Sequence, residues 1–292
     1  KAVLTEDPWS KTGTIAYYNQ ENRLLLEEQG WHGALNLYAR KFKPILGGDY
    51  RLTVSFESQE EEKLFGMGQY QQEVMDLKYC SLELAHRNSQ ASVPFLLSSR
   101  GYGFLWHNPA VGKVTFGKNV TQWESYSTKQ LDYWITAGDT PAEIEEAYAE
   151  ATGKVPMMPE YGLGFWQCKL RYWNQEQVLN VAREYKKRNI PLDVIVIDFF
   201  HWPRMGDFRF DEKFFPDPEA MNKELEAMGV KLMVSVWPQI DLRSENFEEM
   251  KERNLLVKPE MGVNISMTFG GDSLFFDATN PEARKFVWEK CK

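Results

Sequence analysis

The stretch DVIVID at residues 193–198 decides the fold of the second half of the chain. It is an apolar, largely β-branched run without polar alternation, and it ends on Asp198. Such a run is typical of a parallel strand that is buried on both faces. A helix capped by Asn174 precedes it, with apolar residues at helical spacing, and a second helix is expected around residues 219–228. The pattern therefore indicates a sheet whose strands are connected by helices.

Two further strands are predicted on either side of this run. Residues 162–167, GLGFWQ, form a short apolar strand, and residues 230–236, VKLMVSV, form another buried strand. Three strands in this order begin a parallel sheet, either a barrel or a doubly wound fold. The sequence contains no GxGxxG motif and no P-loop, which weighs against nucleotide-binding folds.

The first half of the chain has a different rhythm. Short β-prone runs such as residues 50–56, YRLTVSF, and residues 103–106, GFLW, alternate with turn signals. One of these signals is GGD at residues 47–49, where glycine reaches positive φ without a steric clash. Strands at this density predict an antiparallel β-sandwich.

A helix and two prolines separate the halves. Thr140, Pro141 and Glu143 fit a capping box with proline at the first helical position, so a helix is predicted over residues 142–151. Gly153 ends the helix, and a proline-containing connector follows. The predicted domains are a β-sandwich at 1–139, a helical linker at 140–158 and the first strands of a barrel at 159–292.

The composition restricts the class of function. The 292 residues are 43% hydrophobic and 26% charged, a balance that indicates a folded protein with a core. The net charge of −8, without a long basic run, argues against nucleic acid as a partner. The three cysteines and the histidines lack metal-site spacing, so neither a metal nor a cofactor is predicted. No apolar stretch approaches the roughly 18 residues of a membrane span, and the start at Lys1 suggests a processed or truncated chain.

The strand ends are the candidate functional positions, because barrel enzymes carry their active sites at the C-terminal ends of the strands. Asp198 ends an apolar strand, where an unpaired carboxylate is costly to bury. It accepts sugar hydroxyls or, alternatively, pairs with a basic residue of the barrel. Trp237 follows the next strand, where it forms a stacking wall or simply packs at the barrel mouth. We interpret the nearby His201 as a loop histidine, because no nucleophile motif accompanies it.

Motifs in the first half resemble those of glycoside hydrolase family 31, the retaining α-glucosidases and α-xylosidases. FGMGQ at residues 65–69 is similar to the family's Gly-x-Gly-Glu turn, with Gln69 in place of the usual Glu. HRN at residues 86–88, before VPF at residues 93–95, resembles the family's Asn-Arg-Asp segment. The resemblance implies a galactose-mutarotase-like sandwich, in which Asn88 stands where relatives carry an Asp that reaches the sugar site.

The resemblance continues through the second half in family order and spacing. It includes PEYGLGFW at 159–166, RNIPLD at 188–193 and FPDP at 215–218. By this resemblance Asp198 would bind hydroxyls of the sugar in the cleavage subsite, and Trp237 would stack beside it. Phe199, Phe200 and Arg171 would shape the pocket wall.

The resemblance also implies a mechanism with two carboxylates, a nucleophile and a general acid. In the family both lie on later strands, beyond the segment that resembles DATNPE at residues 277–282, so no catalytic residue is expected within this chain and both are expected C-terminal to Lys292. Asp207 and Asp211 are interpreted instead as surface carboxylates paired with the nearby Arg204 and Arg209. Because an open barrel leaves a bare sheet edge, we expect the fragment to require the remainder of the barrel polypeptide.

The predicted function is the substrate-binding part of an exo-α-glycosidase acting on an oligosaccharide. Phe199 or Phe200 would crowd a hydroxymethyl group at C5 of the sugar, which favours terminal α-linked xylose and an α-xylosidase. The alternatives are an α-glucosidase of the same family, a non-catalytic carbohydrate-binding protein and, more weakly, an unrelated barrel isomerase or lyase. The resemblance is compatible with a homo-oligomer. The sequence does not distinguish a periplasmic or secreted protein from a cytoplasmic one.

Overall fold

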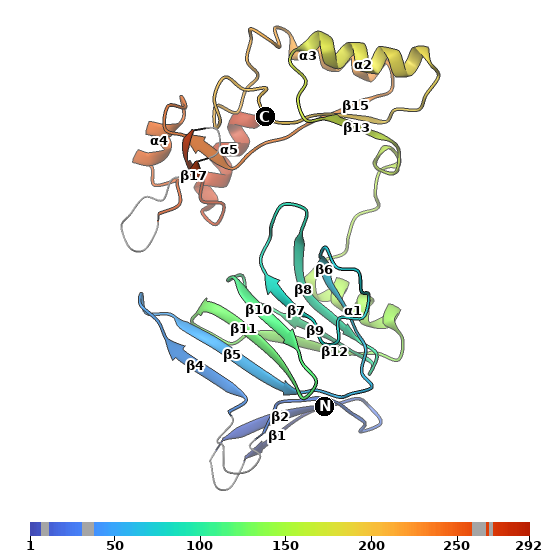
Figure 1. The fold of residues 1–292 in the computed structure, drawn as a ribbon, viewed down its shortest axis with the longest axis vertical. Coiled ribbons are helices and arrows are strands. Elements are labelled where there is room, and N and C mark those ends of the chain that lie inside the picture. The colour runs from blue at the N-terminus through green and yellow to red at the C-terminus, as the bar shows by residue number, and fades with distance from the viewer. Residues whose placement is uncertain (7–11, 31–37, 259–266, 269–270) are drawn as a thin grey trace. The chain divides into compact units, whose positions relative to one another are not determined.

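The computed structural model describes residues 1–6, 12–30, 38–258, 267–268 and 271–292. The chain forms two compact units, Lys1–Val155 and Pro156–Lys292 (Figure 1). Among the described residues, no helix combines the length and the apolar character needed to cross a lipid bilayer.

The first unit is mostly sheet, and its strands pair antiparallel. Its described strands are β1 (Ala2–Glu6), β2 (Gly13–Tyr18), β3 (Leu24–Glu27), β4 (Arg40–Pro44), β5 (Tyr50–Glu57), β6 (Leu64–Gln69), β7 (Ser81–Leu84), β8 (Ala91–Ser98), β9 (Tyr102–Trp106), β10 (Gly112–Phe116), β11 (Val120–Thr128) and β12 (Tyr133–Ala137). They form one sheet in the order β1-β2-β3, a second in the order β4-β5-β11-β10-β7 and a third in the order β12-β9-β8-β6.

The two larger sheets share one hydrophobic core. Phe56 of β5 and Trp123 of β11 come from one sheet, whereas Phe104 of β9 comes from the other. The ring of Phe104 lies 5.3 Å from that of Phe56 and 4.9 Å from that of Trp123, measured between centroids. All three side chains are fully buried, so the core of this unit is built from stacked and edge-on aromatic rings.

The local predictions for this half are confirmed where the turn and cap chemistry is strong. The predicted strands at 50–56 and 103–106 correspond to β5 and β9. Gly47 and Gly48, in the hairpin between β4 and β5, have positive φ angles of 98° and 86°. The predicted helix is α1 (Pro141–Thr152), which begins with a complete capping box between Thr140 and Glu143. Helix α1 packs on β9 and β12.

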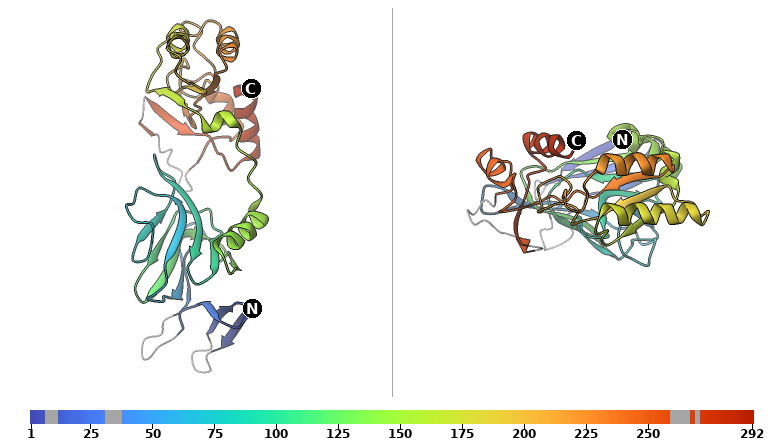
Figure 2. Two further views of the ribbon diagram at one scale, coloured as in Figure 1. Left: turned by 90° about the vertical axis from the view of Figure 1, so that its right-hand side faces the viewer. Right: turned by 90° about the horizontal axis from the view of Figure 1, so that it is seen from above.

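The second unit contains the predicted parallel sheet. Strands β13 (Trp166–Lys169), β14 (Val194–Ile197) and β15 (Lys231–Val234) pair in parallel, with β14 in the centre. Helices α2 (Gln175–Lys187) and α3 (Pro218–Ala227) follow β13 and β14 and lie side by side (Figure 2). Ile195 and Ile197 belong to the same hydrophobic cluster as the apolar residues of these helices. The side chain of Asn174 caps α2, as predicted.

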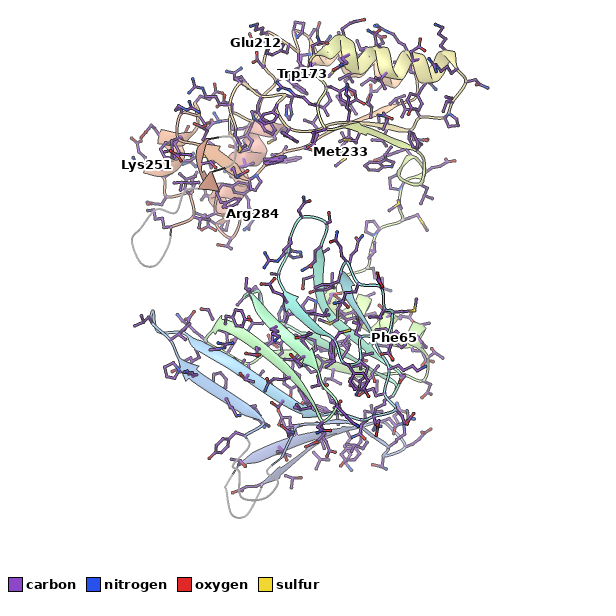
Figure 3. The ribbon with its side chains drawn as sticks, in the orientation of Figure 1. Phe65, Trp173, Glu212, Met233, Lys251 and Arg284 are labelled. Carbon is purple, nitrogen blue, oxygen red and sulfur yellow. The ribbon has the colours of Figure 1, made fainter. Side chains whose placement is uncertain are left out.

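Two of the strand predictions are wrong in detail. Residues Glu160–Leu163 form a short 3-10 helix, η1, because the turn closes with a hydrogen bond from Gly162 N to the Pro159 carbonyl oxygen, and pairing starts only at Trp166. The stretch 230–236 is not a fully buried strand. Met233, labelled in Figure 3, is 46% exposed, because exposure alternates along β15 and only the face that carries Leu232 packs against the cluster shared with the helices.

The rest of the unit departs from the strand-helix rhythm. Strands β16 (Gln239–Asp241), β17 (Met267–Thr268) and β18 (Asp272–Phe275) form a small antiparallel sheet with β18 in the centre. Helices α4 (Phe247–Glu252) and α5 (Pro281–Cys291) share a core with this sheet, built around Ile240, Met250 and Phe286. No pattern in the sequence predicted this small sheet.

Candidate functional site

The segment directly after β14 has a constrained backbone. Asp198 directly follows the strand and is half-buried, and its Oδ1 accepts a hydrogen bond from the backbone N–H of Phe199 at 2.9 Å. Phe200 has a φ angle of 67°, in the left-handed region. A bulky residue rarely occupies this region, and such residues cluster at functional sites. The chain therefore turns sharply after the carboxylate of Asp198.

This turn gathers aromatic rings from two strand ends. The rings of Phe199 and Phe200 lie 4.4 Å apart, and that of Phe199 lies 5.2 Å from the ring of Trp237, which follows β15. The rings of Trp202 and Trp237 lie 6.4 Å apart. The structure thus brings Phe199, Phe200 and Trp237 together, because parallel strands end at the same edge of their sheet.

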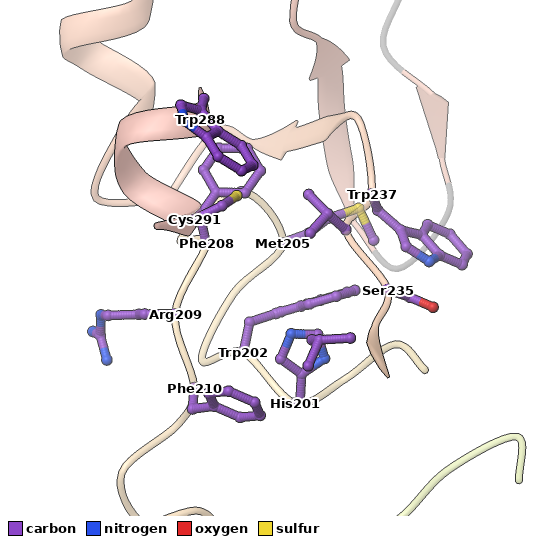
Figure 4. Close-up of a pocket in the computed structure, with 13 residues that line it drawn as sticks. His201, Trp202, Met205, Phe208, Arg209, Phe210, Ser235, Trp237, Trp288 and Cys291 are labelled. Atoms are coloured by element: carbon purple, nitrogen blue, oxygen red, sulfur yellow. The ribbon is translucent and has the colours of Figure 1, made fainter. Parts of the chain in front are cut away.

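A cavity of about 330 Å³ opens beside this cluster (Figure 4). Trp202 and Trp237 line it from the loops after β14 and β15, and Trp288 and Cys291 line it from α5. Aromatic walls of this kind suit the apolar C–H face of a sugar ring, whose hydroxyl groups then require polar partners. The cavity has the size and chemistry of a site for a small saccharide.

His201 also lines the cavity and is buried. Its Nδ1 lies 3.0 Å from the backbone carbonyl oxygen of Asp198, so Nδ1 carries a proton and donates it to this acceptor. Burial lowers the pKa of the imidazole, an effect that the backbone and charge of Asp198 partly oppose. A neutral histidine that fixes the loop agrees with the interpretation as a loop histidine.

Arg171 lies at the mouth of a second cavity of about 260 Å³. Its guanidinium carbon is 3.9 Å from the ring centroid of Trp173 and 5.1 Å from that of Phe200. Trp202 and Met205 line both cavities, so the two are adjacent. The structure thus connects Arg171 to the aromatic cluster through Phe200.

Asn88 belongs to the first unit, where it lies in an exposed turn between β7 and β8. The residues on either side of the turn, Arg87 and Gln90, bridge to each other. The predicted role of Asn88 at a sugar site stays a prediction.

The expectation that Asp207 is a surface carboxylate paired with arginine is wrong. Asp207 is buried, and its Oδ1 accepts the backbone N–H of Glu245 at 3.1 Å. Arg209 pairs with the carboxylate of Glu245 instead. The hydrogen bond joins the loop after β14 to the loop after β16, because Glu245 lies 38 residues further along the chain. Asp211 differs: it is partly exposed, and its Oδ1 accepts the backbone N–H of Lys213, two residues on, in a local turn.

Asp241 is also held in a structural role. It is buried, and Arg243 donates to both of its carboxylate oxygens, from Nε at 3.0 Å and from Nη2 at 2.9 Å. These bonds lower the pKa of the Asp241 carboxyl. The carboxylates of Asp207 and Asp241 therefore stabilise loops of the second unit.

Sequence reasoning missed the contribution of α5. Trp288 and Cys291 lie far along the chain from the strand ends, and no spacing rule links them to Trp237. The available signal was the position of Trp288 outside the buried face of its helix, which Ala283, Phe286 and Val287 form.

Comparisons with known proteins agree with this geometry. A family model described as the glycosyl hydrolases family 31 TIM-barrel domain matches residues 155–292, so the second unit corresponds to part of a TIM-barrel domain. An uncharacterized family 31 glucosidase of Pseudescherichia vulneris is 54% identical, over 96% of this chain and 56% of that protein. An α-xylosidase of Saccharolobus solfataricus is 35% identical, over 83% of this chain and 33% of that protein.

A solved structure extends the similarity to both units. The crystal structure of a GH31 α-xylosidase from a soil metagenome, complexed with xylose, aligns with a TM-score of 0.90 and 51% identity. The alignment covers 100% of this chain and 47% of that one. The chain thus spans about half the length of the P. vulneris protein and of the soil-metagenome enzyme, and about a third of the S. solfataricus enzyme.

Proposed function

The chain belongs to glycoside hydrolase family 31, and from this premise we propose that it forms the substrate-binding part of a retaining exo-α-glycosidase. The enzyme removes terminal α-linked xylose from oligosaccharides. The observation that carries the proposal is the aromatic cluster of Phe199, Phe200 and Trp237 beside the carboxylate of Asp198. The similarity to two α-xylosidases, one of them solved with xylose, supports the choice of sugar.

Asp198 and Trp237 have complementary roles in this proposal. The carboxylate of Asp198 uses one oxygen for the Phe199 N–H, and a carboxylate offers about four lone-pair sites. The remaining sites accept sugar hydroxyls in charge-assisted hydrogen bonds. The indole of Trp237 stacks on the apolar face of the sugar ring and orients it toward the reacting bond.

The chemistry itself requires two further carboxylates. In the retaining mechanism one attacks the anomeric carbon while the other protonates the leaving oxygen, and water then releases the sugar from the enzyme. Asp207 and Asp241 are engaged in loop hydrogen bonds, so neither serves as nucleophile or acid. We infer that residues outside Lys1–Lys292 supply the catalytic pair, and that these need the binding groups of this chain to position the sugar.

The preference for xylose depends on the ring of Phe199. This ring packs against Trp237, whereas Phe200 lines the neighbouring cavity with Arg171. A phenyl ring beside the C5 position of the sugar leaves room for the hydrogen of xylose and crowds the hydroxymethyl group of glucose. The expected discrimination is about 1–3 kcal/mol or more, because a clash is harder to relieve than a missing contact.

The test compares kcat/KM for 4-nitrophenyl α-xyloside and α-glucoside with the full-length enzyme. We expect a preference for the xyloside of at least about fivefold, and we expect Phe199→Ala to shift the ratio toward the glucoside. Phe165→Ala, which removes an exposed ring at the opposite end of the sheet, is the matched control and should leave the ratio unchanged. Preference of the wild type for the glucoside would assign the protein to the α-glucosidases instead, in line with the P. vulneris relative.

A non-catalytic carbohydrate-binding protein is the second candidate. It predicts that xylose binds, as measured by titration calorimetry, while neither aryl glycoside is hydrolysed. Loss of that binding in Trp237→Ala would still place the sugar at this cavity. Hydrolysis of either substrate excludes this candidate.

We also infer that the first unit is a galactose-mutarotase-like β-sandwich within residues 1–139. The single core shared by its two larger sheets supports this arrangement. In the proposed linker at 140–158, helix α1 packs on β9 and β12, so the connector between the units begins after Thr152.

A further inference from the structure

Arg171 carries a buried polar atom without a partner. Its Nε is inaccessible to solvent and donates no hydrogen bond to any residue that the structure describes. The guanidinium is held instead against the rings of Trp173 and Phe200. An unsatisfied donor in a charged group is costly, about 1–3 kcal/mol or more, so its presence beside a cavity points to a ligand.

The cavity beside Arg171 has an excess of positive charge. Three arginines and two aspartates line it: Arg171, Arg204, Arg243, Asp211 and Asp241. Arg243 neutralises Asp241 through two hydrogen bonds. Arg204 donates to the backbone carbonyl oxygen of Arg243 at 3.3 Å, and its charge helps to lower the pKa of the Asp241 carboxyl, to which no hydrogen bond joins it.

The charges that remain define the ligand. The three arginines exceed the two aspartates by one positive charge, and Arg171 and Arg204 make no hydrogen bond to a carboxylate among the described residues, so the lining of the cavity is balanced by one further negative charge. A single charge matches a carboxylate better than a phosphate, which carries up to two. The planar fork of arginine also fits the two oxygens of a carboxylate.

We propose that this cavity binds the carboxylate of an acidic sugar unit, the one joined to the xylose that is cleaved. Trp202 and Met205 line both this cavity and the one beside Trp237, so adjacent units of one saccharide occupy the two cavities. Phe200 and Trp202 then contact the acidic sugar ring, while Arg171 and Arg204 bind its carboxylate. The inference rests on the proposed function, because it takes the Trp237 cavity as the site of the terminal sugar.

The test uses the full-length enzyme and two disaccharides with α-linked xylose, one joined to glucuronic acid and one to glucose. The substrates differ only in a carboxylate against a hydroxymethyl group. We expect kcat/KM to be at least about tenfold higher for the acidic disaccharide, as one charge-assisted contact provides. The ratio should fall toward one in Arg204→Gln and in Arg171→Gln, and it should decline with rising salt in the wild type.

Arg188→Gln is the matched control, since it removes an exposed arginine of the same unit that lies outside the cavity. It should retain the full ratio. A wild type without preference, or a preference that persists in both cavity variants, overturns the inference. Because Arg204 is exposed, its variant is expected to fold even if the Arg171 variant does not.

A binding measurement separates this inference from the proposed function. If neither disaccharide is hydrolysed, titration calorimetry with D-glucuronate and D-glucose decides the question. Binding of glucuronate over glucose, lost in Arg204→Gln, supports the anionic site while the glycosidase proposal fails. Absence of glucuronate binding refutes the site, whatever the activity on neutral xylosides.

Discussion

The aromatic residues of the two units differ in burial and in what they contact, a difference that the amino-acid composition does not reveal. In the first unit, the rings of Phe56, Phe104 and Trp123 are buried and stack on one another. In the second, the rings of Phe200 and Trp237 are partly exposed and border cavities. Rings that contact only each other contribute to stability, whereas rings that face a cavity keep apolar surface for a ligand.

The sheets explain this difference. Buried residues of the two larger sheets of the first unit form one shared core, and this core holds the rings of Phe56, Phe104 and Trp123. In the second unit the helices cover one face of the parallel sheet, and side chains such as Trp166 and Met233, which point to the other face, are 43% and 46% exposed. An aromatic ring is therefore buried when it lies on a sheet face that another layer covers, and the residue type alone does not determine this.

Phe104→Ala should have the largest effect, a decrease in the free energy of unfolding. Deleting a fully buried phenyl ring costs about 3–5 kcal/mol of unfolding free energy, because both burial and packing are lost. The same deletion at Phe200, which is 37% exposed, should cost much less. Chemical denaturation of both variants measures the difference, and equal losses would contradict the division between core rings and site rings.

Asp198→Asn should have an intermediate effect, on activity and not on stability. In the proposed role the carboxylate of Asp198 binds sugar hydroxyls, so its replacement should remove about 1.5–3 kcal/mol of charge-assisted hydrogen bonding. This corresponds to a fall of about 10- to 150-fold in kcat/KM for the aryl xyloside. Asparagine retains the acceptor for the Phe199 N–H, so the loop should keep its conformation.

Asp193→Asn is the control for this measurement. Asp193 directly precedes β14, at the end of the strand that is opposite to Asp198. Its Oδ2 accepts the backbone N–H of Phe165 at 2.9 Å. Its replacement should leave kcat/KM within about twofold, since barrel strands place functional groups at their C-terminal ends. A comparable fall in kcat/KM in both variants would show that Asp198→Asn lowers activity by perturbing the fold and not by removing a contact with the sugar.

His201→Gln should have the smallest effect, on the pH dependence of stability. Because burial lowers the pKa of His201 in the folded protein, the unfolded chain binds the proton first as the pH falls below about 6.5. The wild type should therefore lose stability from about pH 6.5 downward, until the folded form is also protonated. Melting temperatures between pH 5 and pH 8 should show a shallower decline in the variant, and an unchanged decline would reject the assignment to His201.

Several elements could be predicted because short-range interactions determine them. The capping box between Thr140 and Glu143 begins α1, and Asn174 begins α2, since each side chain satisfies a nearby backbone donor. The apolar run at 193–198 indicated the central strand β14. By contrast, β16 and β18 have three and four residues and acquire their pairing from each other, so no local pattern indicated them.

The printed sequence was sufficient to predict the three parallel strands with their helices, the family, and the positions of Asp198, Phe199, Phe200 and Trp237 at strand ends. These follow from periodicity, caps and motifs, which are properties of neighbouring residues. The burial of Asp207, the place of Trp288 in the cavity beside Trp237 and the meeting of Arg171 and Arg204 at a second cavity follow from the tertiary structure alone. Burial, charge balance and cavity walls arise from residues distant in the chain, and local sequence does not encode their distances.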